Sequence, residues 1–457
     1  MTRPEPNHEL AEVMRAAGVS NKALGRAVES DHTAVSRWLS GVQPRPATAQ
    51  RIASFLSARL GRQVELAEIG MAVSEALSPS LGIAYPDAVS ESIDTLGKLW
   101  VADLDELRQI VNAPADGHAW SEASLGWLVR SDEVEAFISN SGGGRVGTTD
   151  VGMIETTATL FSDLDNRFGG GHGRRALVQY LRTDAKRMLS GSYTESTGRA
   201  LCVAVSEATL LAAWMSYDAG IHGLAQRYFI QALRLAQAAQ DDLLAGSILD
   251  AMSHQATFLG RFREAANLAR AARTGTRGKA TNTLTAHFHA MEARALAVGG
   301  DASGAEKALG QAVRVFERRK PGDDPEWISY FDDAELSAEF SHCFRDLGRG
   351  KDAVTYAERA LAGAAGASAR SDFFVTMVKA AGQLRGRAGQ LRDAEVDQAC
   401  VTIRRALEVG IQVKSARCAQ YLREVRTTLL PFAHLAAVKE LEADHLDHPL
   451  WIASGGD

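Results

Sequence analysis

Two pairs of adjacent aspartates come closer than any other residues of this chain to a metal-binding pattern. Asp323-Asp324 and Asp332-Asp333 flank the end of a polar segment, Arg318–Tyr330. Carboxylate oxygens are the ligands that hard cations prefer, so such clusters can bind Mg²⁺ or Ca²⁺. Aspartate also favours solvated loops and the first turn of a helix. We adopt the second interpretation, and we expect neither a metal nor a cofactor.

Other patterns with chemical potential are equally weak. The run from Gly169 to Arg175, GGGHGRR, is glycine-rich, but it lacks the Lys-Ser/Thr pair of a phosphate-binding loop and no strand precedes it. His287 and His289 alternate on a predicted helix, so they face different directions and cannot be paired ligands. The sequence contains no HExxH, GxSxG or CxxC motif. We therefore expect a protein that is not an enzyme.

Composition narrows the class further. The chain has 457 residues, 46% of them hydrophobic and 23% charged, and only 11 prolines. This balance favours a helical protein of two or more domains. No apolar run approaches the ~20 residues that cross a bilayer, and the first residues lack the apolar core of a signal peptide. The four cysteines, Cys202, Cys343, Cys400 and Cys418, are scattered and are expected to be reduced. We expect a cytoplasmic protein without membrane contact.

Charge is distributed unevenly along the chain. Between Val13 and Arg62 there are eight Lys/Arg and two Asp/Glu, which gives this segment a charge of +6. Because the net charge of the whole chain is -6, the rest of the chain carries a charge of -12. A basic head on an acidic body suits a protein whose head binds a polyanion such as DNA.

The basic segment reads as short helices. Small polar residues at helix starts and glycines at helix ends set their limits. Ser20 and Asp31 are predicted N-caps, and Gly18 and Gly41 are predicted stops. Apolar residues at helical spacing, including Trp38, are predicted to face inward. The predicted helices are Asn7–Ala17, Asn21–Val28, His32–Ser40, Ala47–Leu60 and Glu65–Leu77.

The second and third of these helices resemble a known family. The run from Asn21 to Leu56, and above all Ala34–Gly41 (AVSRWLSG), is similar to the lambda-repressor-like, XRE-type helix-turn-helix. That family usually has glycine in the turn where this chain has Glu29. The resemblance implies a domain over residues 1–77 that places its third helix in the major groove of DNA.

The same resemblance implies roles for individual residues. His32, Thr33, Ser36 and Arg37 correspond to base-reading positions, and Arg37 fits the O6/N7 edge of guanine. The alternative for Arg37 is a surface ion pair with Glu29 or Asp31. Phosphate contacts are expected from the start of the second helix and the segment after the third, namely Ser20, Asn21, Lys22, Gln43 and Arg45.

Residues 78–150 give weaker signals. Helices are predicted at about Ala88–Leu99, Asp103–Asn112 and Asp132–Ser139, and Ser139–Gly144 reads as a flexible loop. Trp100, Trp120 and Trp127 also fall here. We expect a small helical connector between head and body.

A repeat dominates the rest of the chain. Five glycines are each followed five residues later by alanine, and seven residues beyond that by another alanine, or by Val401 in the fifth case. Glycine ends a helix where the chain must turn, and alanines seven apart let paired helices approach closely. The successive glycines are 40, 40, 48 and 41 residues apart. The register consists of Gly220, Gly260, Gly300, Gly348 and Gly389, with Ala225, Ala265, Ala305, Ala353 and Ala394, and with Ala232, Ala272, Ala312 and Ala360.

This pattern resembles tetratricopeptide repeats, although with longer helices than the usual ~34-residue unit. The resemblance implies an all-α chain with a helical solenoid over 151–445, a tail over 446–457, and a concave face that binds peptides or proteins. Head and body together resemble actinobacterial regulators of this module order. That resemblance implies a role in development or secondary metabolism.

Two functions remain open at this point. The first is a transcriptional regulator that binds an operator in double-stranded DNA and forms a homodimer through the repeats, with a peptide, small molecule or protein as possible effector. The second is a repeat scaffold whose head binds a protein partner in place of DNA. The basic head favours the first.

Overall fold

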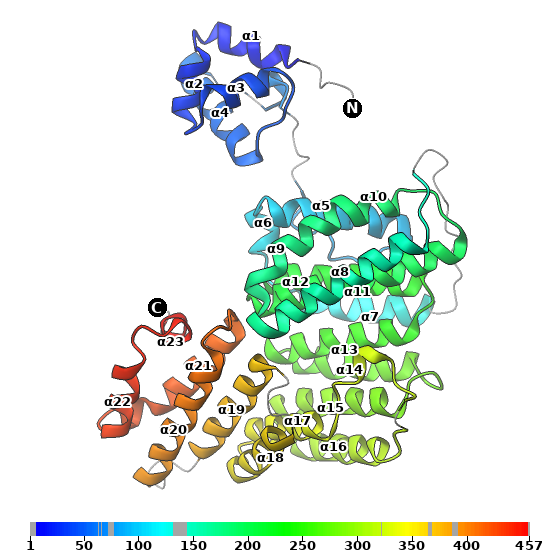
Figure 1. The fold of residues 1–457 in the computed structure, drawn as a ribbon, viewed down its shortest axis with the longest axis vertical. Helices are drawn as coiled ribbons and strands as arrows, with labels where there is room; N and C mark the ends of the chain where they lie inside the picture. The colour runs from blue at the N-terminus through cyan, green and yellow to red at the C-terminus, as the bar shows by residue number, and fades with distance from the viewer. Residues whose placement is uncertain are drawn as a thin grey trace. The chain divides into compact units, whose positions relative to one another are not determined.

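The computed structural model shows an all-α chain, as predicted (Figure 1). Two compact units divide at residue 79: a head, Met1–Pro79, and a body, Ser80–Asp457. Residues from Ser80 onward, which we expected to form a separate connector up to 150, thus belong to the body. The structure describes residues 6–62, 64, 66–71, 77–130, 144–320, 322–363, 368–385 and 392–455.

The head is a cluster of four helices around one small core. They are α1 (His8–Ala16), α2 (Asn21–Ala27), α3 (His32–Leu39) and α4 (Pro46–Leu60). The core contains Leu10, Leu24, Val35 and Leu56, each fully buried, and Trp38 at 7% exposure. The expected amphipathic faces are therefore present, with Trp38 inward.

Two details of the head differ from prediction. Helical spacing in the second predicted helix places Leu24, Ala27 and Val28 inward; Leu24 and Val28 are buried, but Ala27, the last residue of α2, is exposed. In place of the fifth helix the described residues show a 3-10 turn, η1 (Leu66–Ile69), which Gly70 follows with a φ of 57°. Residues 72–76 lie outside the described part.

The body is a stack of helical hairpins. Each hairpin has a first and a second helix that pack along their length. The five pairs are α11 (Glu195–Asp218) with α12 (His222–Ala238), α13 (Asp242–Phe258) with α14 (Phe262–Gly275), α15 (Asn282–Val298) with α16 (Ala302–Phe316), α17 (Asp333–Asp346) with α18 (Gly350–Gly363), and α19 (Ala369–Gln383) with α20 (Asp393–Gly410).

Glycine turns join the first four pairs as the repeat predicts. Gly220, Gly260, Gly300 and Gly348 have φ between 72° and 81°, the left-handed region that glycine adopts without cost. At each turn the residue after the glycine donates its N–H five residues back, as Ile221 does to the Ser216 carbonyl at 2.9 Å. These are the bonds of a Schellman cap, which ends one helix so that the next can fold back.

The alanine register holds in four repeats and fails in the fifth. The predicted alanines of the first four repeats are at most 3% exposed. In α20, however, Ala394 is exposed and Val401 is 56% exposed, while Val396 and Ile403 are fully buried. The contact face is therefore shifted by two residues because α20 starts later than the pattern requires. Gly389 lies outside the described residues.

The first helices lie on the inner side of the stack. Each contacts the next first helix, from α11 through α13, α15, α17 and α19 to α21 (Ala416–Leu429). Helices on the inside of a curved stack lie closer together than those on the outside, so these helices form the concave side.

The outer side of the first repeats is covered by three helices that precede them. They are α5 (Val89–Leu104), α6 (Arg108–Val111) and α7 (Gly117–Arg130), and they pack on α12 and α14. Trp100, Trp120 and Trp127 are fully buried there. These helices of the expected connector therefore form a layer that covers the repeats and is continuous with them. The predicted helix Asp132–Ser139 lies outside the described residues.

A second hairpin leads into the repeats. It pairs α8 (Thr148–Phe168) with α9 (Gly170–Tyr180), which continues through a π-helical turn, η2 (Leu181–Ala185), into α10 (Lys186–Leu189). Both α8 and α9 pack on α11. Among the described residues, α11 alone is long and apolar enough to cross a membrane, yet 67% of its most apolar window is buried, as in the core helix of a helical stack.

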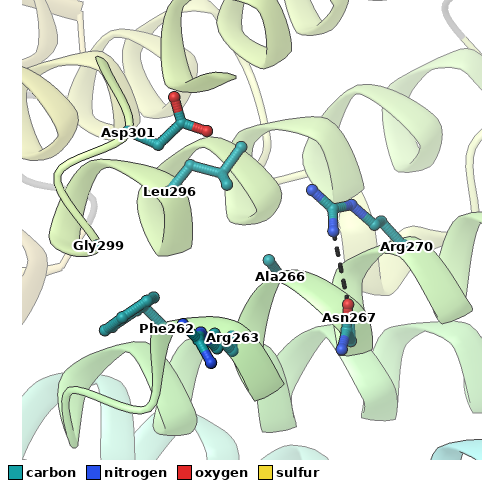
Figure 2. Close-up of a pocket in the computed structure, with 8 residues that line it drawn as sticks. All are labelled: Phe262, Arg263, Ala266, Asn267, Arg270, Leu296, Gly299 and Asp301. Carbon is teal, nitrogen blue, oxygen red and sulfur yellow. Dashed lines mark hydrogen bonds between the residues drawn. The ribbon is translucent and has the colours of Figure 1, made fainter. Parts of the chain in front are cut away.

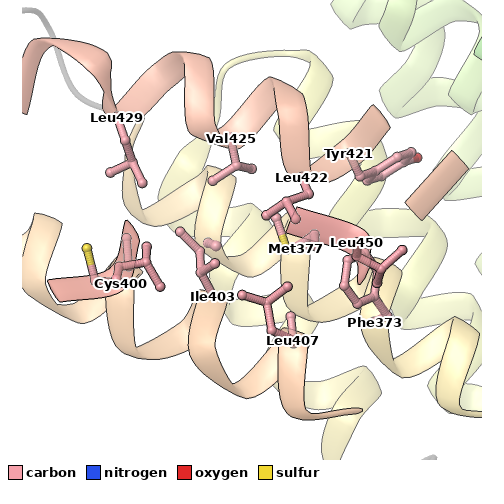
Figure 3. Close-up of a cluster of buried hydrophobic side chains, with 14 of the residues drawn as sticks. Phe373, Met377, Cys400, Ile403, Leu407, Tyr421, Leu422, Val425, Leu429 and Leu450 are labelled. Atoms are coloured by element: carbon pink, nitrogen blue, oxygen red, sulfur yellow. The ribbon is translucent and has the colours of Figure 1, made fainter. Parts of the chain in front are cut away.

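The C-terminal end of the stack has its own core (Figure 3). Phe373 from α19, Ile403 from α20 and Leu422 from α21 are fully buried against one another. We expected a tail over 446–457, but that segment contains α23 (Pro449–Ser454), whose Trp451 is only 4% exposed. With α22 (Ala436–Asp444), α23 closes the apolar end of the stack.

Candidate functional site

The head presents one polar face on α3. His32, Thr33, Ser36 and Arg37 are exposed, and they alternate with the buried Val35 and Trp38. The four predicted base-reading side chains therefore share the outward side of one helix. Such a helix can offer hydrogen-bond donors to a groove or to another polar surface.

The turn before α3 fixes how that face is presented. Glu29, which stands where the helix-turn-helix family that the sequence resembles usually has glycine, adopts a left-handed φ of 54°. Asp31 caps α3 by accepting from the Ala34 N–H and from Thr33 Oγ1, both at 2.6 Å. The Thr33 hydroxyl and the Ala34 amide hold the pKa of Asp31 below its ordinary value. One predicted site residue thus helps to cap its own helix.

Arg37 is available for a ligand. The alternative ion pairs do not form, because Glu29 pairs with Arg51 at 3.1 Å and Asp31 is engaged as the cap. Among the described residues no acid lies within ion-pair distance of Arg37.

The structure brings some of the predicted phosphate contacts to the same face. Asn21, at the start of α2, donates to Ser36 Oγ at 3.5 Å, and Ser20 caps α2 through the Ala23 amide. Lys22 is exposed beside them. Gln43 donates to the Gly70 carbonyl at 3.1 Å instead, and Arg45 is exposed at the start of α4.

The inner side of the body carries a second candidate site, which the sequence did not reveal. Buried polar side chains from successive first helices touch one another there. Arg294 of α15 donates to Glu339 of α17 at 3.2 Å and to His342 Nδ1 at 3.4 Å. Tyr217 of α11 lies 3.0 Å from His254 of α13. A polar network therefore runs along the concave side.

The ionisation of this network follows from its burial. Burial and the Arg294 guanidinium lower the pKa of His254 and of His342 well below the ordinary value. Burial also lowers the pKa of His287, but the carboxylate of Asp250, 2.8 Å away, outweighs it and the net pKa is raised. His254 and His342 are therefore neutral beside permanent arginine charges, whereas Asp250 favours the charged form of His287.

The network continues to a junction where the two ends of the stack meet. Asp218, at the end of α11, accepts from Ser415 Oγ at 2.8 Å, from Arg417 Nε at 3.1 Å and from the Gly170 amide at 3.1 Å. Arg370 of α19 pairs with Asp165 of α8 at 2.8 Å. We call this junction the seam: Asp165, Gly170, Asp218, Arg370, Ser415 and Arg417.

The signal that could have revealed these residues is a charge on an otherwise apolar helix. Arg294 stands among alanines and leucines in α15, and Asp218 ends the apolar α11. Such charges are buried only when they are paired. Their partners, however, are distant in sequence.

The remaining candidates serve structural roles. Asp332 caps α17 through the Ala334 and Glu335 amides, and Asp324 accepts from Thr283 at 2.7 Å. His289 contacts Arg273, on a different side of α15 from His287. The four cysteines are buried and free. In the described part of the chain no group of acids, cysteines and histidines could hold a metal ion.

The glycine-rich run joins α8 to α9. Gly169 has a φ of 81° at this turn. The two arginines of the run pair with acids beside α5, Arg174 with the buried Asp103 and Arg175 with Glu106. The run is therefore a helix-to-helix turn.

Two of the cavities that the described residues of the body form lie near the features above. One, of about 360 Å³, is between α14 and the α15–α16 turn (Figure 2). Phe262, Arg263 and Arg270 line it, and Arg270 donates to Asn267 at 3.5 Å. The other, of about 250 Å³, adjoins the seam.

Comparisons with known proteins give two matches. Residues 7–72 match a family model described as the SP15 N-terminal domain, a description other than the XRE-type helix-turn-helix that the sequence resembles. The structure is also similar to the crystal structure of a Rap protein complexed with Competence and Sporulation Factor. The identity is 13% and the TM-score 0.39, over 98% of this chain and 99% of that one. None of the curated proteins matches.

Proposed function

We propose that this protein is a non-enzymatic binding protein whose repeat body holds a polypeptide segment along its concave side. The observation that supports this most directly is the inner network. First helices from α11 to α21 present guanidinium, carboxylate, imidazole and aromatic groups toward one another across several repeats. Most of these groups are buried and bonded to one another, so a bound peptide would contact the half-buried members, among them His254 and Phe258.

Half-buried aromatic side chains give the inner side its apolar contacts. Phe258 of α13 stacks on Tyr421 of α21 with ring centroids 6.4 Å apart, and Phe374 lies 5.0 Å from the same ring. Aromatic residues with partly exposed edges are enriched where proteins bind partners.

A matched pair of phenylalanines allows a direct test. Phe258 ends the inner helix α13, and Phe262 begins the outer helix α14 on the other side of the Gly260 turn. Peptides selected from a random displayed library on the full chain should bind at least about tenfold more weakly to Phe258→Ser. Phe262→Ser should keep the affinity. Affinity lost only in Phe262→Ser would move the site to the outer side and contradict the proposal.

We propose a second function for the head, sequence-specific binding of double-stranded DNA. Its specific support is the exposed face of α3, where Arg37 has no ion-pair partner among the described residues, in a segment of +6 charge. We propose homodimerisation through the body together with it, because two heads can span half-sites ~34–36 Å apart. A peptide on the body would then regulate the heads, in a role in development or secondary metabolism.

A mobility-shift assay with genomic fragments tests this function. Arg37→Ala should weaken binding to a selected fragment by about 1–3 kcal/mol, while Arg15→Ala, an equal charge loss on the exposed side of α1, should change it little. If no fragment is preferred over random DNA at physiological salt, the head is instead a protein-binding module. Light scattering of the full chain measures the dimer.

A further inference from the structure

A groove on the outer side of the stack contains the larger cavity, between α14 and the α15–α16 turn (Figure 2). Its apolar recess is formed by Phe262 and Ala266 of α14 and by Leu296 of α15, and Phe262 is 39% exposed. Arg263 and Arg270 line it from the exposed side of α14. A cavity of about 360 Å³ is at the small end of ligand pockets, with room for one large side chain. We call this site the outer groove.

A buried carboxylate fixes two arginines at this groove. Glu292 of α15 is 8% exposed, and it accepts from Arg270 Nε at 2.7 Å and from Arg273 Nη1 at 2.5 Å. Arg273 also donates to His289 Nδ1 at 3.1 Å. One carboxylate thus serves two guanidinium groups, which leaves one positive charge over. Each guanidinium has five N–H donors, and these bonds use only part of them.

Two further arginines add positive charge without a carboxylate of their own. Arg263 lines the groove, and Arg314 lies on the exposed side of α16. Neither has an ion-pair partner in the described part of the chain. Burial lowers the pKa of His289 to about 4, and the charges of Arg273 and Arg314 act in the same direction. His289 is therefore neutral at pH 7, and the charge around it is that of the arginines.

The acids of these helices do not cancel that charge. Residues 261–279 contain six Lys/Arg and a single acid, Glu264, whose carboxylate lies against the start of α7. On α16, Glu306 pairs with Arg349, at the start of the next hairpin's second helix. Asp301 lines the groove, but its carboxylate caps the start of α16 at 2.9 Å. In a chain of net charge -6, the outer groove is therefore a local positive surface.

We infer that the outer groove binds an acidic peptide segment of a partner protein, with one large apolar side chain in the recess beside Phe262. The inference goes beyond the proposed function, because this groove is built on the second helix α14 and not on the concave side. Carboxylates pair with arginine in a planar, bidentate geometry. Arg263 and Arg270 are about 10.5 Å apart along α14, a spacing that a peptide reproduces with acids seven residues apart in a helix or three apart in an extended chain. A nucleic acid carries a phosphate on every nucleotide and would place charge against Asp301 and Glu292.

The direct test uses capped peptides of seven residues on the full chain. The first has glutamates on both sides of a central phenylalanine. The second has glutamines in place of the glutamates, and the third has alanine in place of the phenylalanine. Titration calorimetry at about 0.15 M ionic strength should show saturable binding of the first peptide and at least about tenfold weaker binding of the other two. Equal affinity of the first and second peptides overturns the inference.

Three variants locate the binding. Arg263→Glu places a negative charge in the groove at an exposed position, so it should weaken the first peptide at least about tenfold without loss of helical signal. Arg405→Glu, the same change at an exposed position of α20, should leave the affinity unchanged. Asp301→Asn keeps the cap of α16, since asparagine is also a good N-cap, and should strengthen binding about two- to fivefold. A gain of affinity cannot come from damage to the fold. Equal effects of the two arginine variants, or no gain in Asp301→Asn, would contradict the site.

Two comparisons identify the partner class and separate this inference from the proposed function. A short single-stranded oligonucleotide that binds more tightly than the first peptide, and loses affinity in Arg263→Glu, would make the groove a phosphate site and overturn the inference. Phe262→Ser should weaken the acidic peptide and Phe258→Ser should not, the reverse of the pattern for concave-side peptides.

The peptide library of the proposed function is therefore selected with the acidic peptide in excess, which occupies the outer groove. If library peptides bind and the acidic peptide does not, the outer groove is wrong and the proposed function stands. If the acidic peptide binds and no library peptide is selected, the outer groove stands and the proposed function is wrong.

Discussion

The Arg294–Glu339 pair offers the sharpest test of the inner network. The two side chains are only 7% and 6% exposed, and their nearest atoms are 3.2 Å apart. Glu339→Leu leaves the guanidinium buried without its carboxylate. Arginine cannot escape by losing its proton, since it stays charged in proteins. Removal of one partner of a buried pair costs about 3–5 kcal/mol, which multiplies the unfolded fraction by roughly 10² to 5 × 10³.

The double replacement distinguishes charge burial from loss of packing. Arg294→Met together with Glu339→Leu removes both charges and fills similar volume, which is often neutral or stabilising. His254 and His342 keep hydrogen-bond partners in that variant, Tyr217 at 3.0 Å and Tyr421 at 3.5 Å. We therefore expect the double variant to recover most of the lost stability.

Urea unfolding of the full chain, followed by helical circular dichroism, measures both effects. The single variant should shift the midpoint of the body's transition downward, and the double variant should return it toward the parent value. If Glu339→Leu costs less than about 1 kcal/mol, the pair is not desolvated as described. A double variant as unstable as the single one would refute the argument from charge burial.

Three further predictions concern titration, turns and caps. The pKa of His342 is depressed in the folded state, so its contribution to stability is complete above pH 6.5 and falls by about 1.4 kcal/mol per pH unit below it. The free energy of unfolding of His342→Gln, measured between pH 6.5 and 5, should therefore fall less steeply with decreasing pH than that of the parent chain. Gly300→Ala should destabilise by about 1–2 kcal/mol because its φ is 77°, whereas Gly310→Ala, inside α16, should stabilise by about 0.5–1 kcal/mol in the same thermal assay. Asp31→Ala should cost the head about 1 kcal/mol through its lost cap, seen as faster amide exchange in α3 with α13 unchanged.

The sequence predicted helix ends and helix starts correctly where neighbouring residues alone determine them. Gly220, Gly260, Gly300 and Gly348 mark turns because a left-handed φ ends a helix whatever surrounds it. Asp31 and Ser20 predicted helix starts for the same reason. The predicted alanine register was wrong in the fifth repeat. Ala394 fits the glycine-alanine spacing, but the residue at which α20 begins decides which of its residues face the partner helix. The pattern could not show the two-residue shift, since Val396 and Ile403 are also apolar.

Long-range pairs set the limit of that approach. Asp218 and Arg417 are 199 residues apart, and neither stands in a recognisable motif. Their meeting depends on the accumulated rotation of every hairpin between them, a quantity that no single repeat encodes. The pKa of Asp218 shows what the meeting achieves: burial alone would raise it, but Arg370 and Arg417 hold it below its ordinary value. The buried charge of Asp218 is tolerated only when both ends of the stack are in place. The curvature of the whole body is therefore coupled to the seam.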